Sequence, residues 1–388
     1  NETRAVAELD HPHIIRILDF GQVGEDTGDW LAGSPLLVME LARGGSLASR
    51  CRCLGWTALR PLLLELLDAL AHAHARGIIH LDLKPANVLF CSDFDDRPGI
   101  KVSDFGIARR SMAEPGAGVL GGTPDYMSPE QQQGRVWDFG PWTDLFALGR
   151  LAIALLRHDV LDGSHADAVP RGFSDWIARM LHPRPMHRFP TAADAVASLD
   201  KLPVGSHSDI AEPDWPEPTS RQWPSITASA VFTADAPGDD SAGEISDGQA
   251  PEVFLPPPFP PCWQGASFHS SQPSLPSHSL SMFGLRAIPM MGRRVEHDFL
   301  WEELGKVVSG GARTVVLRGP AGSGKTRLAM WLAERAQELG VAFAMKANHD
   351  AVLGPQDGLE AMVLRFWGGT HVPCPRRTTG FLERLAQR

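Results

Sequence analysis

A long stretch rich in proline, serine and acidic residues, 203–285, divides this chain and rules out a single continuous fold. Arg221 is its only basic residue beside ten Asp or Glu, so most of the chain's net charge of -10 lies here. Such a segment cannot bury enough apolar surface to offset its chain entropy. We therefore expect a disordered linker. A plain flexible spacer is the simpler interpretation, and a proline-rich docking site for an aromatic-lined groove is the alternative.

The remaining composition is that of ordinary packed domains. The chain has 388 residues, 43% of them hydrophobic, which suits two domains beside the linker. Its acidic balance argues against a nucleic-acid partner, and its five scattered cysteines fit free thiols in a reducing cytoplasm. Gly149 and Arg150 interrupt the best candidate for a membrane span. Because the sequence starts at Asn1 without methionine or a targeting pattern, we expect a fragment of a longer protein.

Residues 1–202 show the mixed apolar periodicity of a packed domain. Leucines recur at helical spacing over 58–75, and Gly77 provides a stop just beyond them. A short buried strand is predicted over 34–41 and a buried helix over 143–156. The first helix leads directly into the run HLDLKPANVLF, which begins at His80.

That run and the DFG at 104–106 hold the residue types that phosphoryl transfer requires. A carboxylate must orient the attacking hydroxyl, and metal ligands must hold the nucleotide in line. Asp82, Lys84, Asn87 and Asp104 are residues of those types in that order. Each of them alone would more often be a turn residue, so the evidence lies in the order of several motifs.

Taken together, the motifs make residues 2–202 resemble the bacterial branch of the Ser/Thr protein kinases. The resemblance implies that Asp82 orients the substrate hydroxyl and that Lys84 neutralises charge on the transferred phosphoryl group. It also implies that Asn87 and Asp104 bind Mg²⁺, with ATP as the phosphate donor. Lysine two residues after the aspartate favours serine and threonine over tyrosine as the acceptor.

Other positions match the same family pattern. In ETRAVAELDHPHIIRILDFG, Glu2 resembles the helix glutamate that pairs with the ATP-binding lysine. Met39, Glu40 and Ala42 resemble the gatekeeper and hinge, whose backbone would hydrogen-bond adenine. Thr123 in GTPDYMSPE resembles the threonine that braces the base and shapes the acceptor pocket.

Three further residues are expected to have architectural roles. Glu130 resembles the glutamate that closes the activation segment, and Arg188 in HPRPMHRF resembles its buried ion-pair partner. Asp144 in TDLFALG resembles the aspartate that anchors the catalytic loop from a buried helix.

The sequence also departs from the kinase pattern. The glycine-rich loop and strand lysine would precede Glu2, so we expect residues 1–388 alone to lack kinase activity. Leu81 occupies the position of an arginine that binds an activation-segment phosphate, and Ser111 is the only hydroxyl between Gly106 and Gly121. We therefore hypothesise a kinase that is not switched by loop phosphorylation. The stretch 157–175 is short for the family, so the protein substrate cannot be inferred.

A second nucleotide site is predicted at GPAGSGKT. It fits the phosphate-binding loop pattern, with the strand candidate TVVLR before it and the helix RLAMWLAERA after it. Its glycines, Gly319, Gly322 and Gly324, let backbone amides surround phosphates at a helix N-terminus. Lys325 would reach the outer phosphates and Thr326 would bind Mg²⁺.

The surroundings of this loop predict an incomplete α/β domain. A strand is expected over 313–317 and a helix over 327–339, while MGRRVEHDFLWEEL resembles the entry segment of AAA-like or STAND-type signalling ATPases. No apolar run ending in an acidic pair follows Thr326, so the water-activating motif is missing. We expect this module to bind nucleotide weakly without hydrolysing it.

The sequence therefore predicts an α+β protein-kinase-like fold at 1–202, a disordered linker at 203–285 and a partial α/β P-loop NTPase domain at 286–388. The expected function is a cytoplasmic bacterial Ser/Thr kinase that uses ATP and Mg²⁺ on protein substrates, with possible intramolecular regulation by the P-loop module. The alternatives are a pseudokinase scaffold whose NTPase is the working switch, and an NTPase enzyme with a kinase-like sensor.

Overall fold

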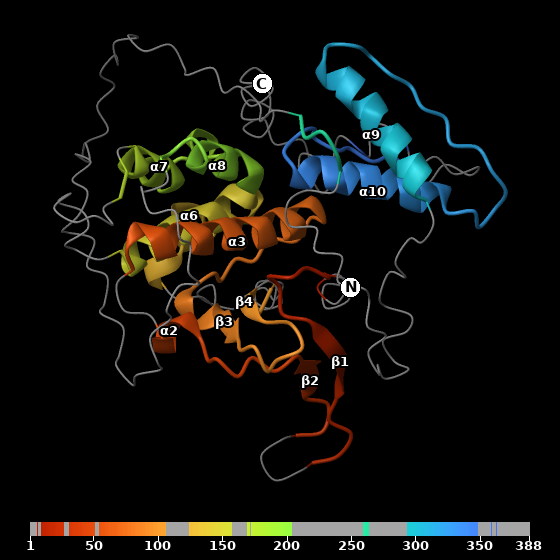
Figure 1. Ribbon diagram of the computed structural model, residues 1–388. Coiled ribbons are helices and arrows are strands. Elements are labelled where there is room, and N and C mark those ends of the chain that lie inside the picture. The colour runs from red at the N-terminus through yellow and green to blue at the C-terminus, as the bar shows by residue number, and fades with distance from the viewer. Residues whose placement is uncertain are drawn as a thin grey trace. The chain divides into compact units, whose positions relative to one another are not determined.

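In the computed structural model the chain separates into two compact units, Asn1–Ser220 with Pro257–Lys346, and Arg221–Pro256 with Ala347–Arg388. The structure describes residues 6, 9–26, 31–50, 54–105, 124–156, 169–170, 172–203, 259–263, 293–347, 358 and 362. Almost all of these belong to the first unit. Its kinase-like part and its P-loop part are described separately below (Figure 1).

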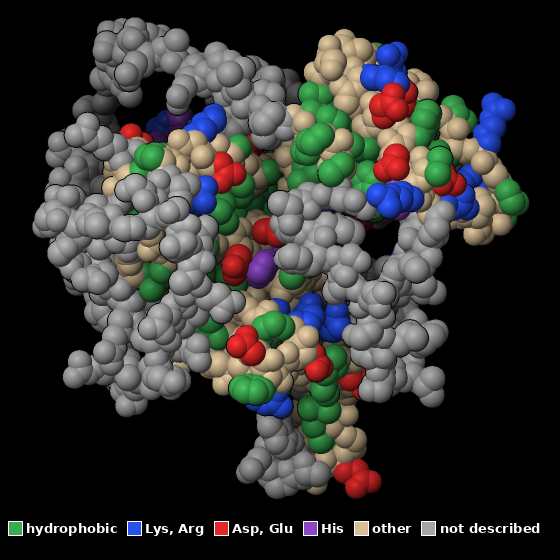
Figure 2. Space-filling model, viewed as in Figure 1, with side chains coloured by type: hydrophobic (Ala, Val, Ile, Leu, Met, Phe, Trp, Pro, Cys, Tyr) green, Lys and Arg blue, Asp and Glu red, His purple; other side chains and the backbone are tan. Residues whose placement is uncertain are grey.

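The first elements form an antiparallel hairpin of β1 (Ile17–Gln22) and β2 (Pro35–Met39). The strand predicted over 34–41 is therefore present, but the expectation that it is buried is wrong. Leu36 is 52% exposed and Val38 is 42% exposed. Leu36 and Val38 are two residues apart and therefore lie on the same face of β2, and within the described residues that face is not covered (Figure 2).

The helix predicted over 58–75 is α3 (Trp56–Ala75), and it forms the centre of the kinase-like core. Every leucine singled out by the periodicity is buried, because one helix face collects residues spaced three and four apart: Leu59, Leu62, Leu63, Leu66, Leu67 and Leu70. Gly77 follows with a φ of 74°, a left-handed conformation that glycine adopts without strain, and the helix ends there.

A second hairpin follows α3 and carries the catalytic motifs. The 3₁₀ turn η1 (Pro85–Asn87) leads into β3 (Val88–Cys91), which pairs antiparallel with β4 (Gly99–Val102). The short helix α2 (Leu47–Arg50) contacts both η1 and β3. HLDLKPAN thus lies between a buried helix and a buried hairpin, and the DFG run begins where β4 ends.

Further helices complete this part: η2 (Pro124–Tyr126), α5 (Pro129–Gln132), η3 (Val136–Asp138), α6 (Pro141–Leu155), α7 (Phe173–Met180), η5 (Pro185–His187) and α8 (Ala192–Leu199). The predicted buried helix corresponds to α6. Helices α3, α6, α7 and α8 contact one another and form the helical layer seen in Figure 1. Its interior contains a row of aromatic rings in contact, edge-on between Trp56 and Phe173, stacked between Phe173 and Trp176, and tilted between Trp176 and Phe189. The α+β class predicted for this part is confirmed.

The P-loop part contains α9 (Arg294–Val308) and α10 (Lys325–Glu338), the latter corresponding to the helix predicted over 327–339. The strand predicted over 313–317 is not formed within the described residues, and Val316 is 66% exposed. A strand requires a hydrogen-bonded neighbour, and none of the described segments pairs with this one.

Residues 259–263, which fall inside the predicted linker, are packed against these helices. The Trp263 indole Nε1 donates to Asp298 Oδ1 at 2.7 Å, and its ring lies edge-on to Trp331, with centroids 5.3 Å apart. Trp301 Nε1 donates to the Pro260 carbonyl at 3.1 Å. Aromatic side chains supply apolar contact area that the rest of the stretch lacks, so this short segment belongs structurally with α9 and α10.

Within the described part of the chain, no helix has both the length and the apolar character needed to cross a membrane.

Candidate active site

The catalytic loop is anchored by one fully buried carboxylate, Asp144 on α6. Its Oδ2 accepts from the His80 backbone N–H at 2.8 Å and from His74 Nε2 at 2.7 Å, while Oδ1 accepts from the Leu81 N–H at 2.8 Å. Burial raises the pKa of Asp144, but the hydrogen bonds from His74 and from the His80 backbone N–H outweigh it and lower the pKa below its ordinary value. The anchoring role expected of Asp144 is confirmed.

Three predicted site residues meet around Asp82. Lys84 Nζ donates to Asp82 Oδ2 at 2.7 Å. Asn87 Nδ2 donates to the Asp82 carbonyl at 2.9 Å and to Oδ2 at 3.2 Å. Side chains of Asp82 and Lys84 are 21% and 24% exposed, so both remain reachable from solvent. The loop therefore presents a carboxylate whose orientation is fixed by two neighbours.

His80 joins this loop to the segment that precedes Asp104. Its Nε2 donates to the Ser103 carbonyl at 2.9 Å, and its Nδ1 accepts from the Asp82 N–H at 3.3 Å. These partners fix a neutral tautomer, and burial lowers the pKa of His80. Sequence reasoning did not assign this role to His80, although its position two residues before Asp82 was a usable signal.

Asn87 and Asp104 have the donor chemistry of a Mg²⁺ site. Because the Asn87 amide nitrogen is bonded to Asp82, its amide oxygen is left as a ligand-type atom. Asp104 has a φ of 61°, a left-handed conformation that is uncommon outside glycine and that is often found at functional sites. An amide oxygen and a carboxylate are hard oxygen ligands, and these two residues fit the ion.

The predicted hinge is held through Glu40. Arg16 donates its backbone N–H to Glu40 Oε1 at 2.7 Å and accepts the Glu40 N–H at 2.9 Å. Arg97 adds a two-point ion pair to the same carboxylate, with Nε at 3.0 Å from Oε2. Arg97 lies in the turn between β3 and β4, far from Glu40 in sequence, so no local pattern could reveal it. Met39 is the last residue of β2, and the side chain of Ala42, three residues later, is half-buried.

Glu130 and Arg188 form the predicted buried pair. Arg188 Nη1 and Nη2 donate to Glu130 Oε1 and Oε2 at 2.7 and 2.9 Å, and neither side chain is exposed. Two other predicted site residues, Glu2 and Thr123, lie outside the described residues, as does Ser111.

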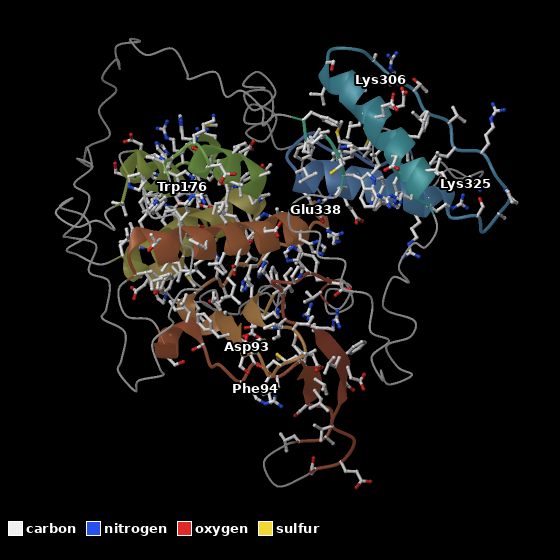
Figure 3. All side chains as sticks on the ribbon, in the orientation of Figure 1. Asp93, Phe94, Trp176, Lys306, Lys325 and Glu338 are labelled. Carbon is white, nitrogen blue, oxygen red and sulfur yellow. The ribbon has the colours of Figure 1, made fainter. Side chains whose placement is uncertain are left out.

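The phosphate-binding loop has the backbone that its glycines predict. Gly322 and Gly324 have φ values of 78° and 83°, and α10 begins immediately afterwards at Lys325 (Figure 3). Lys325 Nζ donates to the carbonyls of Gly319 and Pro320 at 2.9 and 2.7 Å. The ammonium group thus lies over its own loop.

Thr326, the second residue of α10, is exposed. Arg293, just before α9, donates from Nη2 to the Ser323 carbonyl at 2.9 Å. That arginine belongs to the entry segment MGRRVEHDFLWEEL, so the segment contacts the loop directly.

Comparison with known proteins finds a match for each of the two parts of the chain. The model of the protein kinase domain matches residues 1–169, and that of the BREX system ATP-binding protein BrxC/D matches residues 281–359. Serine/threonine-protein kinase Pkn1 of Myxococcus xanthus is 40% identical over 159 residues, which is 40% of this chain and 22% of that protein.

Two further relatives align over longer stretches. Serine/threonine-protein kinase pkn2 of the same organism is 32% identical over 62% of this chain and 32% of its own length. Serine/threonine-protein kinase PknL of Mycobacterium tuberculosis is 29% identical over 60% of both chains. The chain thus spans less than two thirds of each relative. Residues 1–169 are a protein kinase domain related to bacterial Ser/Thr kinases, and the chain joins this domain to a P-loop ATP-binding module.

Proposed function

We propose that the protein is a Ser/Thr protein kinase that transfers the ATP γ-phosphate to protein hydroxyls and is coupled to its P-loop module in cytoplasmic signalling. The observation that carries this proposal is the geometry around Asp82. A carboxylate held by Lys84 and Asn87, on a loop anchored by buried Asp144, is suited to orient an attacking hydroxyl.

Each residue of the loop has a distinct proposed task. Asp82 accepts a hydrogen bond from the substrate hydroxyl and takes its proton as the new P–O bond forms. Lys84, already beside that carboxylate, neutralises charge on the transferred phosphoryl group. Asn87 and Asp104 hold Mg²⁺, which when bound supplies charge neutralisation at the phosphate oxygens.

The proposed contacts with adenine come from the hinge. Glu40 and Ala42 offer backbone groups to adenine, beside the gatekeeper Met39. Glu2 and Thr123 keep the roles that the family resemblance implies, as the lysine partner and the support of the base.

The Leu81 side chain supports the hypothesis that the kinase is not switched by phosphorylation of its activation segment. This side chain is 6% exposed and apolar, so it offers no donor to a phosphate. A phosphosite at Ser111 whose alanine variant abolished activity would contradict this.

In the P-loop module, the positive-φ glycines and Lys325 support nucleotide binding. We propose that Gly319, Gly322 and Gly324 present the backbone amides and that Thr326 takes the metal. We further propose that nucleotide occupancy of this module regulates the kinase domain.

The test is phosphotransfer from radiolabelled ATP by the full-length gene product, compared with Asp82→Asn and Lys325→Ala. Asp82→Asn keeps the side-chain shape but removes the base, and loss of a base costs about 100- to 10,000-fold in rate. Asp93→Asn is the matched control, because Asp93 is an exposed carboxylate in the turn between β3 and β4 (Figure 3).

The outcomes separate the proposed function from the scaffold alternative. Transfer that disappears in Asp82→Asn and persists in Asp93→Asn supports the kinase. An inactive wild-type protein whose partner binding depends on Lys325 would favour a pseudokinase with a working NTPase switch.

A further inference from the structure

Leu81, which directly precedes the proposed base, has a backbone conformation that leucine rarely adopts. Its φ is 66°, in the left-handed region where the Cβ atom crowds the following carbonyl. A non-glycine residue keeps such a conformation when the surrounding structure fixes it from several sides. The groups that hold Leu81 therefore also set the position of Asp82.

Two buried side chains from different elements hold the two peptide groups of Leu81. Asp144 on α6 accepts the Leu81 N–H at 2.8 Å. Gln131 on α5 donates from Nε2 to the Leu81 carbonyl at 2.7 Å. That carbonyl belongs to the peptide group that joins Leu81 to Asp82, so Gln131 acts on the peptide adjoining the base.

The Gln131 amide is itself fixed at both ends. Its Oε1 accepts from the Ser128 backbone N–H and from Ser128 Oγ, both at 3.1 Å. A backbone N–H can only donate and a carbonyl can only accept, so the orientation of the amide is determined from both sides. Gln131 is 3% exposed and Ser128 is fully buried, so water has little access to these bonds.

We propose that Gln131 is a positioning residue for Asp82, linking the start of α5 to the catalytic loop. This inference rests on the kinase function proposed above. Leu81 has no polar side-chain atom, so the contact with α5 uses its backbone carbonyl. An amide-to-carbonyl bond needs no covalent modification, and the link therefore holds the base before any phosphorylation.

Position 131 requires one donor and one acceptor at a fixed separation. Glutamate would place an ionised carboxylate against the Leu81 carbonyl, and only its protonated form could both donate to Leu81 and accept from Ser128. Methionine matches the length but offers neither bond. The two substitutions therefore differ in a way that pH can reveal.

The experiment measures kcat and KM for ATP in the full-length gene product and in Gln131→Met, Gln131→Glu and Gln132→Met. Gln132 is the matched control, since it is the next residue of α5 and is exposed, with its Nε2 bonded to the Met127 carbonyl. Thermal unfolding is recorded for each variant, and rates are measured well below each midpoint.

We expect Gln131→Met to lower kcat by about 10- to 100-fold, as for a misplaced catalytic group, while KM for ATP stays within about 3-fold. Gln132→Met should match the wild type. The rate of Gln131→Glu relative to wild type should rise as pH falls from 8 to 6, because the protonated side chain restores the bridge. This pH-dependent recovery separates positioning from a structural defect.

A wild-type kcat in Gln131→Met, or a relative rate of Gln131→Glu that stays constant with pH, would overturn the role of Gln131 and leave the kinase intact. Absence of transfer by the wild-type protein would instead overturn the proposed function, and the role of Gln131 with it.

Discussion

Replacing Glu130 with glutamine should destabilise the kinase domain strongly, because it leaves Arg188 buried without a counter-charge. All five N–H donors of Arg188 have partners in the structure. Two go to the Glu130 carboxylate, and the other three go to the carbonyls of Trp142, His182 and Pro183. Glu130→Gln preserves the shape of the site and removes the charge that compensates the guanidinium.

Removing one charged partner of a buried ion pair is expected to lower the free energy of unfolding by about 3 to 5 kcal/mol. For a domain of this size, 1 kcal/mol corresponds to about 2 to 4 °C, so the midpoint should fall by roughly 6 to 20 °C. Asp138→Asn is the control, because Arg135 and Asp138 form an ion pair whose side chains are 35% and 32% exposed. Loss of that pair should cost less than about 1 kcal/mol.

Labelling of Cys91 offers an assay specific to this domain. Cys91 lies in β3, is 8% exposed and is a free thiol, so a thiol reagent reaches it when the domain opens. Its labelling is followed by mass spectrometry across a temperature series. A midpoint for Glu130→Gln within 2 °C of the Asp138→Asn midpoint would refute the assignment of a stabilising buried pair.

Three further predictions concern other parts of the chain. Burial, with the nearby charge of His11, lowers the pKa of His13 from its ordinary 6.5 to about 4. Between these pH values the unfolded state binds more protons than the folded state, so the stability of the domain should fall as pH drops from 6.5 to 4. His13→Gln should flatten that fall in thermal midpoints measured across the window. In the native protein Cys262, which is exposed, should react with a thiol reagent well before Cys91. Lys325→Ala should weaken nucleotide binding in calorimetry without moving the unfolding midpoint, since Lys325 bonds to its own loop; a shift above about 3 °C would contradict this.

The parts of the kinase domain that could be predicted from the amino-acid sequence are those marked by residue spacing or by a recognisable motif. The helix over 58–75 followed from its leucine spacing, and the anchoring by Asp144 and the pairing of Glu130 with Arg188 followed from family motifs. These interactions join motifs that each carry their own pattern, so both partners of each contact can be named from the amino-acid sequence alone.

Other contacts could not be predicted because one partner has no distinguishing pattern. Gln131 stands in a run of three glutamines, and nothing in the run shows which one reaches the Leu81 carbonyl. Arg97 lies in an acidic turn, where an arginine is most simply a solvated surface residue. Trp263 lies in a stretch whose overall composition predicts disorder, although its own side chain is the exception.

The catalytic loop and the phosphate-binding loop are held in different ways. In the catalytic loop, buried partners from α5 and α6 hold both peptide groups of Leu81, so we expect substrate binding to require little reorganisation of Asp82. In the phosphate-binding loop, the Lys325 ammonium donates to the carbonyls of Gly319 and Pro320, which belong to its own loop. Contacts with other elements thus fix the position of the proposed base, whereas local contacts fix the position of the lysine.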